Sequence, residues 1–141
     1  MNWDDLNNEK DYEPRKVYNQ SKLSNILFTR ELAKRLRDTN VTVNALHPGV
    51  VRTELGRHFS EAYGWKAIMF QVAFFPLIYW MFKTSEQGAQ TNIYCAVASD
   101  LQKVTGKYFA DCKEKELMPH ALSDEEAQRL WTVSEKMVQL K

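Results

Sequence analysis

The sequence has no glycine-rich run of the kind that cradles a phosphate group. Its glycines stand apart at positions 49, 56, 64, 88 and 106, and they form neither Gly-x-x-x-Gly-x-Gly nor Gly-x-Gly-x-x-Gly. Such a run brings backbone N–H groups to a phosphate at the start of a helix. The chain therefore has no phosphate-binding turn of this type.

Cysteine and histidine are also scarce. The two cysteines, Cys95 and Cys112, and the three histidines, at positions 47, 58 and 120, do not follow any metal-ligand spacing. This pattern argues against a disulfide framework and against a zinc site. We expect both cysteines to be small buried thiols in a reducing compartment.

An excess of charge of one sign is missing too. The 19 basic and 18 acidic side chains leave a formal net charge of +1, so no basic surface for a nucleic acid partner is expected. Residues 1–13 are acidic and polar, unlike a signal or transit peptide. With 44% hydrophobic and 26% charged residues, the composition is that of one globular domain.

The first half of the chain predicts a helix followed by a strand. Residues 1–17 are polar and predict a lead-in loop, with Pro14 suited to a first helical turn. Residues 18–37 lack glycine and proline and carry apolar side chains around most of a helix, which needs cover on more than one side. Residues 41–47 are rich in β-branched side chains and end at Pro48–Gly49, as a short buried strand does.

A second helix is predicted after position 83. Thr84 and Gln87 have the spacing of a capping box, and the helix that they open is expected to end near Asp100. The apolar stripe predicted for this helix consists of Ala89, Ile93, Ala96 and Val97.

A second strand and a third helix complete the chain. Gly106 marks a turn into residues 107–112, a strand candidate. Ser123, with Glu126 three residues later, predicts the start of the last helix. One face of that helix is expected to carry Ala127, Leu130, Trp131, Met137 and Val138. Because a long helix followed by a short buried strand is the repeating step of a parallel sheet, the fold class is α/β.

Three tyrosines are followed four residues later by a lysine, a spacing that puts both side chains on one helix face. The pairs are Tyr12 with Lys16, Tyr18 with Lys22, and Tyr79 with Lys83. An ammonium about 4 Å from a phenol, at an effective dielectric near 20, contributes about 4 kcal/mol toward its use as an acid or base near neutrality. Only Tyr18 begins a long helix that leads to a strand and a Pro-Gly turn.

The turn at Pro48–Gly49 gives the Tyr18 pair its context. Ligands of open parallel sheets bind outside the carboxyl ends of the strands. Gly49 lets the backbone approach a flat ring, and Pro48 fixes the direction of the chain. Taken alone, the same residues are also consistent with a simple strand end.

The order YNQSK, helix, VNALHPGVVRT resembles the short-chain dehydrogenase/reductase family, whose catalytic helix carries Tyr-x-x-x-Lys and whose next strand ends in Pro-Gly-x-x-x-Thr. SKLSNILFTRELAKRL, LHPGVVRTEL, SEQGAQTNIYCA and TGKYFADC are similar to its microsomal retinol dehydrogenase branch. The resemblance implies the C-terminal part of a Rossmann-type doubly wound parallel sheet whose N-terminal dinucleotide-binding half is missing. It divides this partial domain into residues 1–17, 18–56, 57–83 and 84–141.

The resemblance also implies roles for individual residues. Tyr18 would exchange a proton with the substrate oxygen and also belongs to the implied cofactor-binding residues. Lys22 would hold the nicotinamide ribose hydroxyls and assist that transfer. The nicotinamide would be lined by Pro48, Gly49, Val51 and Thr53. The cofactor implied is NADP, with NAD as the alternative, and the substrate is a hydrophobic small molecule such as a retinoid. Ser21 and Ser24 are interpreted as helix-surface hydroxyls, because the catalytic serine of the family lies upstream of the Tyr helix.

Residues 65–82 are rich in aromatic side chains and allow three interpretations: an apolar lid over the substrate, a membrane-surface segment, or core packing. By resemblance the protein would lie at the cytosolic face of the endoplasmic reticulum membrane, with a mitochondrial membrane or the cytoplasm as alternatives. The alternative function is a catalytically inactive fragment that acts as an interaction or membrane-associated module. The oligomeric state cannot be predicted from the sequence.

Overall fold

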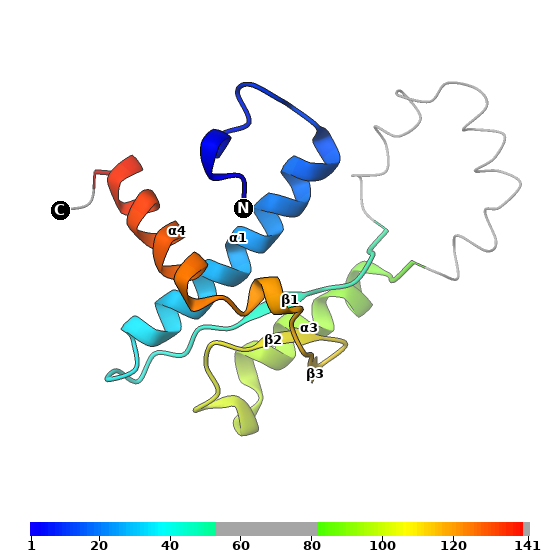
Figure 1. Ribbon diagram of the computed structural model, residues 1–141. Helices are drawn as coiled ribbons and strands as arrows, with labels where there is room; N and C mark the ends of the chain where they lie inside the picture. The colour runs from blue at the N-terminus through cyan, green and yellow to red at the C-terminus, as the bar shows by residue number, and fades with distance from the viewer. Residues whose placement is uncertain (53–81, 140–141) are drawn as a thin grey trace, which may run out of the picture.

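The computed structural model describes residues 1–52 and 82–139 (Figure 1). In chain order the described elements are the short 3-10 helix η1 (Trp3–Asp5), α1 (Pro14–Arg35), β1 (Ala45–His47), α3 (Ser85–Val97), η3 (Ser99–Leu101), β2 (Tyr108–Ala110), β3 (Lys113–Glu114), η4 (Pro119–Ala121) and α4 (Asp124–Met137).

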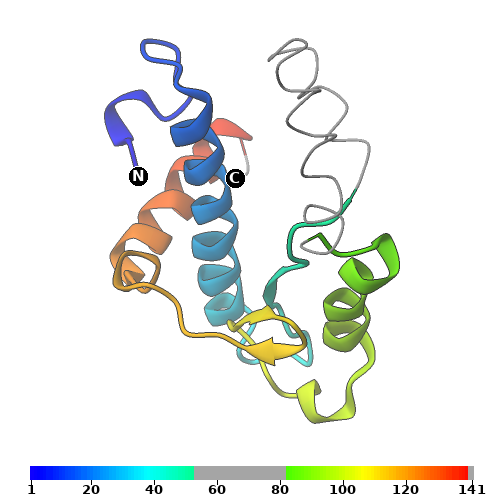
Figure 2. The same ribbon diagram turned by 90° about the vertical axis from the view of Figure 1, so that its right-hand side faces the viewer.

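The strands form one small sheet in the order β1-β2-β3. β1 and β2 are parallel, with Ala45 opposite Tyr108 and His47 opposite Ala110. Helices α1 and α4 lie on one side of this sheet and α3 lies on the other (Figure 2). The parallel pair between helix layers confirms the predicted α/β class. The antiparallel edge strand β3, which pairs with β2, was not predicted.

Helix α1 begins earlier, and strand β1 later, than the sequence predicted. Pro14 is the first residue of α1, so the helix begins four residues before Tyr18. The strand prediction over residues 41–47 was wrong in its first half, since β1 holds only Ala45–His47. Before the strand, hydrogen bonds to side chains take the place of backbone bonds between strands. The N–H of Val43 donates to Thr105 Oγ1 (3.0 Å), and Asn44 Nδ2 donates to the carbonyl of Val104 (2.8 Å).

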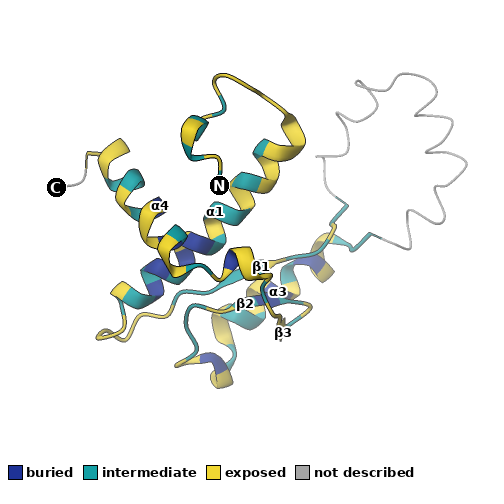
Figure 3. Cartoon of the chain, in the orientation of Figure 1, coloured by how far each residue is buried: buried dark blue, intermediate teal, exposed yellow. Residues whose placement is uncertain are grey.

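The main hydrophobic cluster lies between α1 and α4, where the ribbon is darkest in Figure 3. Leu27 of α1 and Ala127 of α4 are fully buried, and Leu130 is 7% exposed. The apolar face predicted for α4 is thus confirmed at Ala127 and Leu130. It was wrong at its C-terminal end, where Met137 and Val138 are 54% and 64% exposed.

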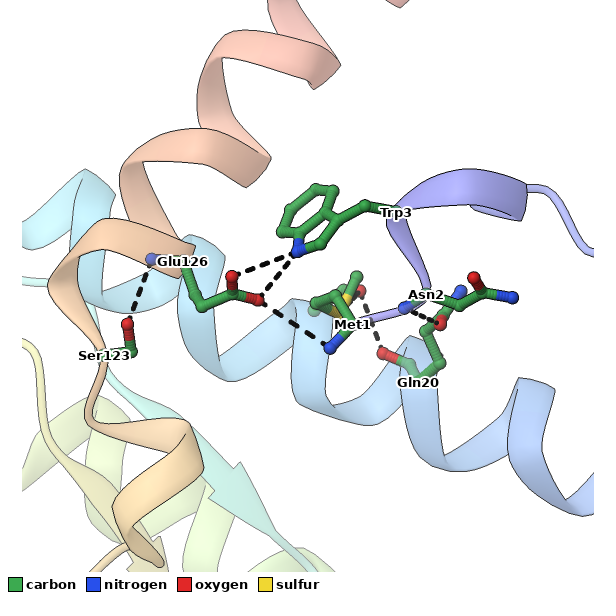
Figure 4. Close-up of polar contacts among 7 residues, drawn as sticks. Met1, Asn2, Trp3, Gln20, Ser123 and Glu126 are labelled. Carbon is green, nitrogen blue, oxygen red and sulfur yellow. Dashed lines mark hydrogen bonds and ion pairs between the residues drawn. The ribbon is translucent and has the colours of Figure 1, made fainter.

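The N-terminal segment packs on this cluster through one carboxylate at the start of α4. The indole Nε1 of Trp3 donates to both oxygens of Glu126 at 3.0 Å, and the amino group of Met1 lies 3.7 Å from Glu126 Oε2 (Figure 4). Ser123 Oγ accepts the N–H of Glu126 at 3.1 Å, so the predicted N-cap is confirmed. A carboxylate in the first turn of α4 also meets the positive end of the helix dipole.

Helix α3 starts as predicted but turns a different face to the sheet. The predicted capping box is present: the N–H of Gln87 donates to Thr84 Oγ1 at 3.2 Å, and the N–H of Thr84 donates to Gln87 Oε1 at 2.9 Å. The predicted apolar stripe was wrong, because Ile93 and Val97 are 51% and 75% exposed. The buried positions are instead the small residues Gly88 and Thr91. Small side chains let this helix approach the sheet closely, and the hydroxyl of Thr91 is satisfied by the N–H of Cys112 at 3.3 Å.

Asp124 links α4 to α1 and makes the contact between these helices dependent on pH. Its carboxylate accepts from Lys34 Nζ at 2.8 Å and from Arg30 Nη2 at 2.7 Å. Lys34 and then Arg30 hold the pKa of Asp124 below its ordinary value of 3.8. Because the folded-state pKa is lowered, the stabilisation is present above pH 3.8 and is lost as the pH falls further.

We expect Asp124→Asn to lower the free energy of unfolding by less than about 1 kcal/mol at neutral pH, since exposed ion pairs contribute little. The difference from wild type should shrink in acid. Urea unfolding at neutral and acidic pH measures both quantities. Asp38→Asn is the control, because Asp38 makes no ion pair with any described residue. A difference that does not change with pH would contradict the assignment.

Candidate active site

The two residues of the Tyr18–Lys22 pair lie one turn apart on the same side of α1. Tyr18 is 60% exposed, and the Lys22 ammonium lies 5.1 Å from the centroid of its ring. The phenol hydroxyl is therefore accessible from solvent and a cation stands beside the ring. A group bound here can meet both at once.

Ion pairs distinguish this pair from the other two Tyr-x-x-x-Lys pairs. Lys16 is bound to Glu13 at 2.6 Å, and this carboxylate raises the pKa of Lys16. Lys83 is bound to Asp111, also at 2.6 Å, while Tyr79 lies outside the described residues. Among residues 1–52 and 82–139, Lys22 makes no ion pair with a carboxylate. Its charge is accordingly available to a ligand or to the phenol.

The Pro-Gly turn follows β1 directly. Gly49 has a φ of +90°, a conformation that other residues rarely adopt. A Cβ at this position would also lie 3.0 Å from the Cδ, Cε and Nζ atoms of Lys83. Gly49 is thus favoured by the backbone conformation, and a side chain here would also displace the end of Lys83. Of the other residues expected to line this turn, Val51 points its side chain at Gly88 of α3, and Thr53 lies outside the described residues.

The start of α1 and the end of β1 lie toward the same end of the molecule (Figures 1 and 2). This follows from the topology, because a helix and the next strand of an α/β fold run in opposite directions. Parallel strands bind ligands beyond their carboxyl ends. The helix end with Tyr18 and the turn with Gly49 therefore share the end at which such folds bind ligands.

Two other features of the sequence can be placed with respect to this site. The hydroxyls of Ser21 and Ser24 donate to the carbonyls of Tyr18 and Gln20 at 2.8 Å and 2.9 Å, so their interpretation as helix hydroxyls is confirmed. The aromatic stretch predicted at residues 65–82 lies outside the described residues except for Phe82. None of the described helices combines the length and apolar character needed to cross a membrane.

A contact that the sequence did not predict joins the Pro-Gly turn to β2. Lys83 Nζ donates to the carbonyl oxygen of Pro48 at 3.2 Å and to Asp111 Oδ1 at 2.6 Å. The lysine holds the pKa of the Asp111 carboxyl below its ordinary value. In the sequence Asp111 falls inside the strand predicted over residues 107–112, whereas β2 ends at Ala110, and the partner from 28 residues earlier could not be deduced from it.

A parallel strand pair between helix layers, with a helix start and a Pro-Gly turn at the carboxyl end of the strands, is typical of part of a Rossmann-type α/β domain. Residues 6–64 match the short chain dehydrogenase family. The chain belongs to this family, and the resemblance predicted from the sequence is confirmed.

The chain is also similar to several retinol dehydrogenases. It is 52% identical to retinol dehydrogenase 14 of Homo sapiens over 141 residues, covering 99% of this chain and 40% of that protein. It is 48% identical to retinol dehydrogenase 12 of Homo sapiens over 92% of this chain and 38% of that protein. It is 45% identical to retinol dehydrogenase 13 of Mus musculus over 99% of this chain and 41% of that protein. The chain thus spans about 40% of the length of these relatives.

Proposed function

We propose that the chain supplies the acid/base part of the active site of a nicotinamide-dependent oxidoreductase that interconverts a hydrophobic alcohol, such as retinol, and its carbonyl compound. The observation that carries this proposal is the exposed Tyr18 hydroxyl at the start of α1 with the Lys22 ammonium beside its ring. The substrate class is supported by the similarity to retinol dehydrogenases along nearly the whole chain.

The described residues fit a cofactor that carries a ribose and a flat ring. Lys22 has no carboxylate competitor among them and would bind the ribose hydroxyls. The Pro48–Gly49 backbone would line the ring, together with Val51, whose side chain points at Gly88, and with Thr53, which lies outside the described residues. When bound, the cofactor, which we propose to be NADP, supplies or accepts the hydride. Tyr18 donates its Oη proton to the carbonyl oxygen in reduction and accepts it back in oxidation.

A lipid-soluble substrate also suggests where the protein works. We propose contact with the cytosolic surface of the endoplasmic reticulum membrane, where such a substrate partitions. Fractionation of cells that express a tagged chain tests this location. Recovery in the soluble fraction would contradict it.

A chimera tests the activity, because the chain spans about 40% of its relatives. We define the retinol dehydrogenase 14 chimera as the Homo sapiens protein in which the segment that aligns with the present chain is replaced by residues 1–141 of the present chain. We expect NADPH-dependent reduction of retinal at a rate comparable with that of the parent protein. A folded chimera that binds NADPH but reduces neither retinal nor another hydrophobic carbonyl compound would overturn the proposal.

The second candidate is a non-catalytic interaction module. It is favoured by the apolar outer side of α3, where Ile93 and Val97 are 51% and 75% exposed. Calorimetric titration of the 141-residue chain with NADPH separates the candidates. Saturable micromolar binding would rule out a module without a cofactor site.

A further inference from the structure

Lys83 holds three segments together at the carboxyl end of the sheet. Its backbone forms a parallel bridge with Val51: the N–H of Lys83 donates to the carbonyl of Val50, and the N–H of Arg52 donates to the carbonyl of Lys83, both at 2.9 Å. Its side chain then reaches back across the turn to Pro48 and on to Asp111, the residue after β2. One residue therefore ties the chain before α3 to the ends of β1 and β2.

The Lys83 side chain and Gly49 fit each other closely. A Cβ on Gly49 would lie 3.0 Å from each of the last three atoms of the lysine, closer than nearly all real contacts of this kind. The aliphatic stem thus lies flat against the glycine, and the ammonium reaches the carbonyl oxygen of the preceding Pro48. The conformation of the turn and the path of the lysine are mutually dependent.

Stability alone does not account for this arrangement. The side chains of Lys83 and Asp111 are 30% and 63% exposed, and ion pairs of that exposure contribute little to folding. The φ of 55° at Asp111 belongs to the two-residue turn between β2 and β3, in which positive φ is favoured, so it gives no separate reason for the ion pair. What the pair does accomplish is to fix the orientation of one carbonyl, that of Pro48, at the ligand-binding end of the sheet.

We propose that Lys83, anchored by Asp111, is a positioning residue that fixes the Pro48–Gly49 backbone for cofactor binding. The inference rests on the proposed function, since it takes that turn to line the nicotinamide. Lys83 acts through the turn and does not touch the reacting atoms. Its loss therefore weakens cofactor binding and leaves proton transfer at Tyr18 unchanged.

The kinetic test uses Lys83→Met in the retinol dehydrogenase 14 chimera. Methionine keeps an unbranched stem against Gly49 but cannot donate a hydrogen bond. We expect the KM for NADPH to rise about tenfold, or about 1.4 kcal/mol, with little change in kcat and an unshifted pH profile. Lys83→Arg should restore most of the affinity, since a guanidinium can donate to both oxygens.

The matched control is Lys107→Met. Lys107 makes an ion pair of similar length with Glu114, 2.7 Å apart, and also lies on the surface, just ahead of β2 and away from the turn. We expect this variant to leave the KM for NADPH unchanged. Equal effects of the two substitutions would overturn the inference, and so would an unchanged KM in Lys83→Met.

The contacts of Lys83 with Pro48 and Asp111, called the Lys83 clamp below, can be tested without any cofactor by hydrogen exchange in the 141-residue chain. In Lys83→Met we expect the amides of Lys83 and Arg52 to exchange several-fold faster, while amides in the middle of α1 keep their rates. Unchanged exchange would overturn the clamp itself. An inactive wild-type chimera would instead refute the proposed function, and the exchange result would still report on the clamp.

Discussion

Replacing Tyr18 with phenylalanine in the retinol dehydrogenase 14 chimera is expected to lower kcat by about 10² to 10⁴, the range of general acid–base catalysis. The substitution removes only the hydroxyl. The ring can still accept the Lys22 ammonium, which lies 5.1 Å from its centroid, so the helix and its cation are retained. Because Tyr18 as a whole is 60% exposed, loss of its hydroxyl is not expected to unfold the chain.

Steady-state kinetics with retinal and NADPH measure this effect. The KM for NADPH should change little, because the cofactor contacts proposed for Lys22 and the Pro-Gly turn are unaltered. This outcome differs from that of Lys83→Met, which raises the KM and spares kcat. The two substitutions thus separate the proton-transfer residue from the positioning residue.

Tyr12→Phe is the matched control. Tyr12 is 69% exposed and also precedes a lysine by four residues, but Lys16 is bound to Glu13. We expect full activity in this variant. Equal losses in the Tyr12 and Tyr18 variants, or a kcat retained in Tyr18→Phe, would refute the assignment of Tyr18.

The local signals in the sequence were sufficient for the starts of α3 and α4. Thr84 and Ser123 cap these helices as predicted, because an N-cap depends on side chains within three residues of each other. The parallel pairing of β1 with β2 was likewise accessible, since a helix between two short buried strands leaves few other topologies.

The face of α3 could not be predicted, because periodicity locates apolar side chains and not close approaches. Ile93 and Val97 have the spacing of a buried stripe and are exposed. Gly88 and Thr91 are buried because they are small enough for α3 to contact Val51 and the end of β2. From the sequence alone, a glycine within a helix indicates a lower helix propensity and does not reveal that another segment packs closely against it.

The same limit applies to the candidate site. Tyr18 and Lys22, like the Pro48–Gly49 turn, were identified from motifs that each span only a few residues. The contacts of Lys83 with Pro48 and Asp111 join positions 35 and 28 residues apart, and no short-range pattern encodes them. The role of Glu126 in binding Trp3 was hidden for the same reason, with 123 residues between the partners.

Substitution of Gly88 by alanine is expected to destabilise the chain by about 1 to 3 kcal/mol, the usual cost of overpacking. On an exposed helix the same change stabilises by about 1 kcal/mol, because alanine has the higher helix propensity. At Gly88 the new Cβ would lie 2.5 Å from Cγ2 and 3.1 Å from Cγ1 of Val51. Either α3 or the segment after the turn must shift, and this reverses the sign of the effect.

Urea unfolding of the 141-residue chain measures the free energy difference. Ala96→Gly, on the exposed side of the same helix, is the propensity control and should cost about 1 kcal/mol. If Gly88→Ala stabilised the chain by the same amount, the close contact with Val51 would be refuted.

A double-mutant cycle with Val51→Ala locates the clash. Removing the two methyl groups of Val51 leaves room for the new Cβ, so Gly88→Ala should be much less destabilising in that background than in the wild type. Val51 lies two residues after Gly49 and bridges to Lys83, so a shift at Val51 also moves the turn that the proposed function assigns to the cofactor. In the chimera, Gly88→Ala is therefore expected to raise the KM for NADPH.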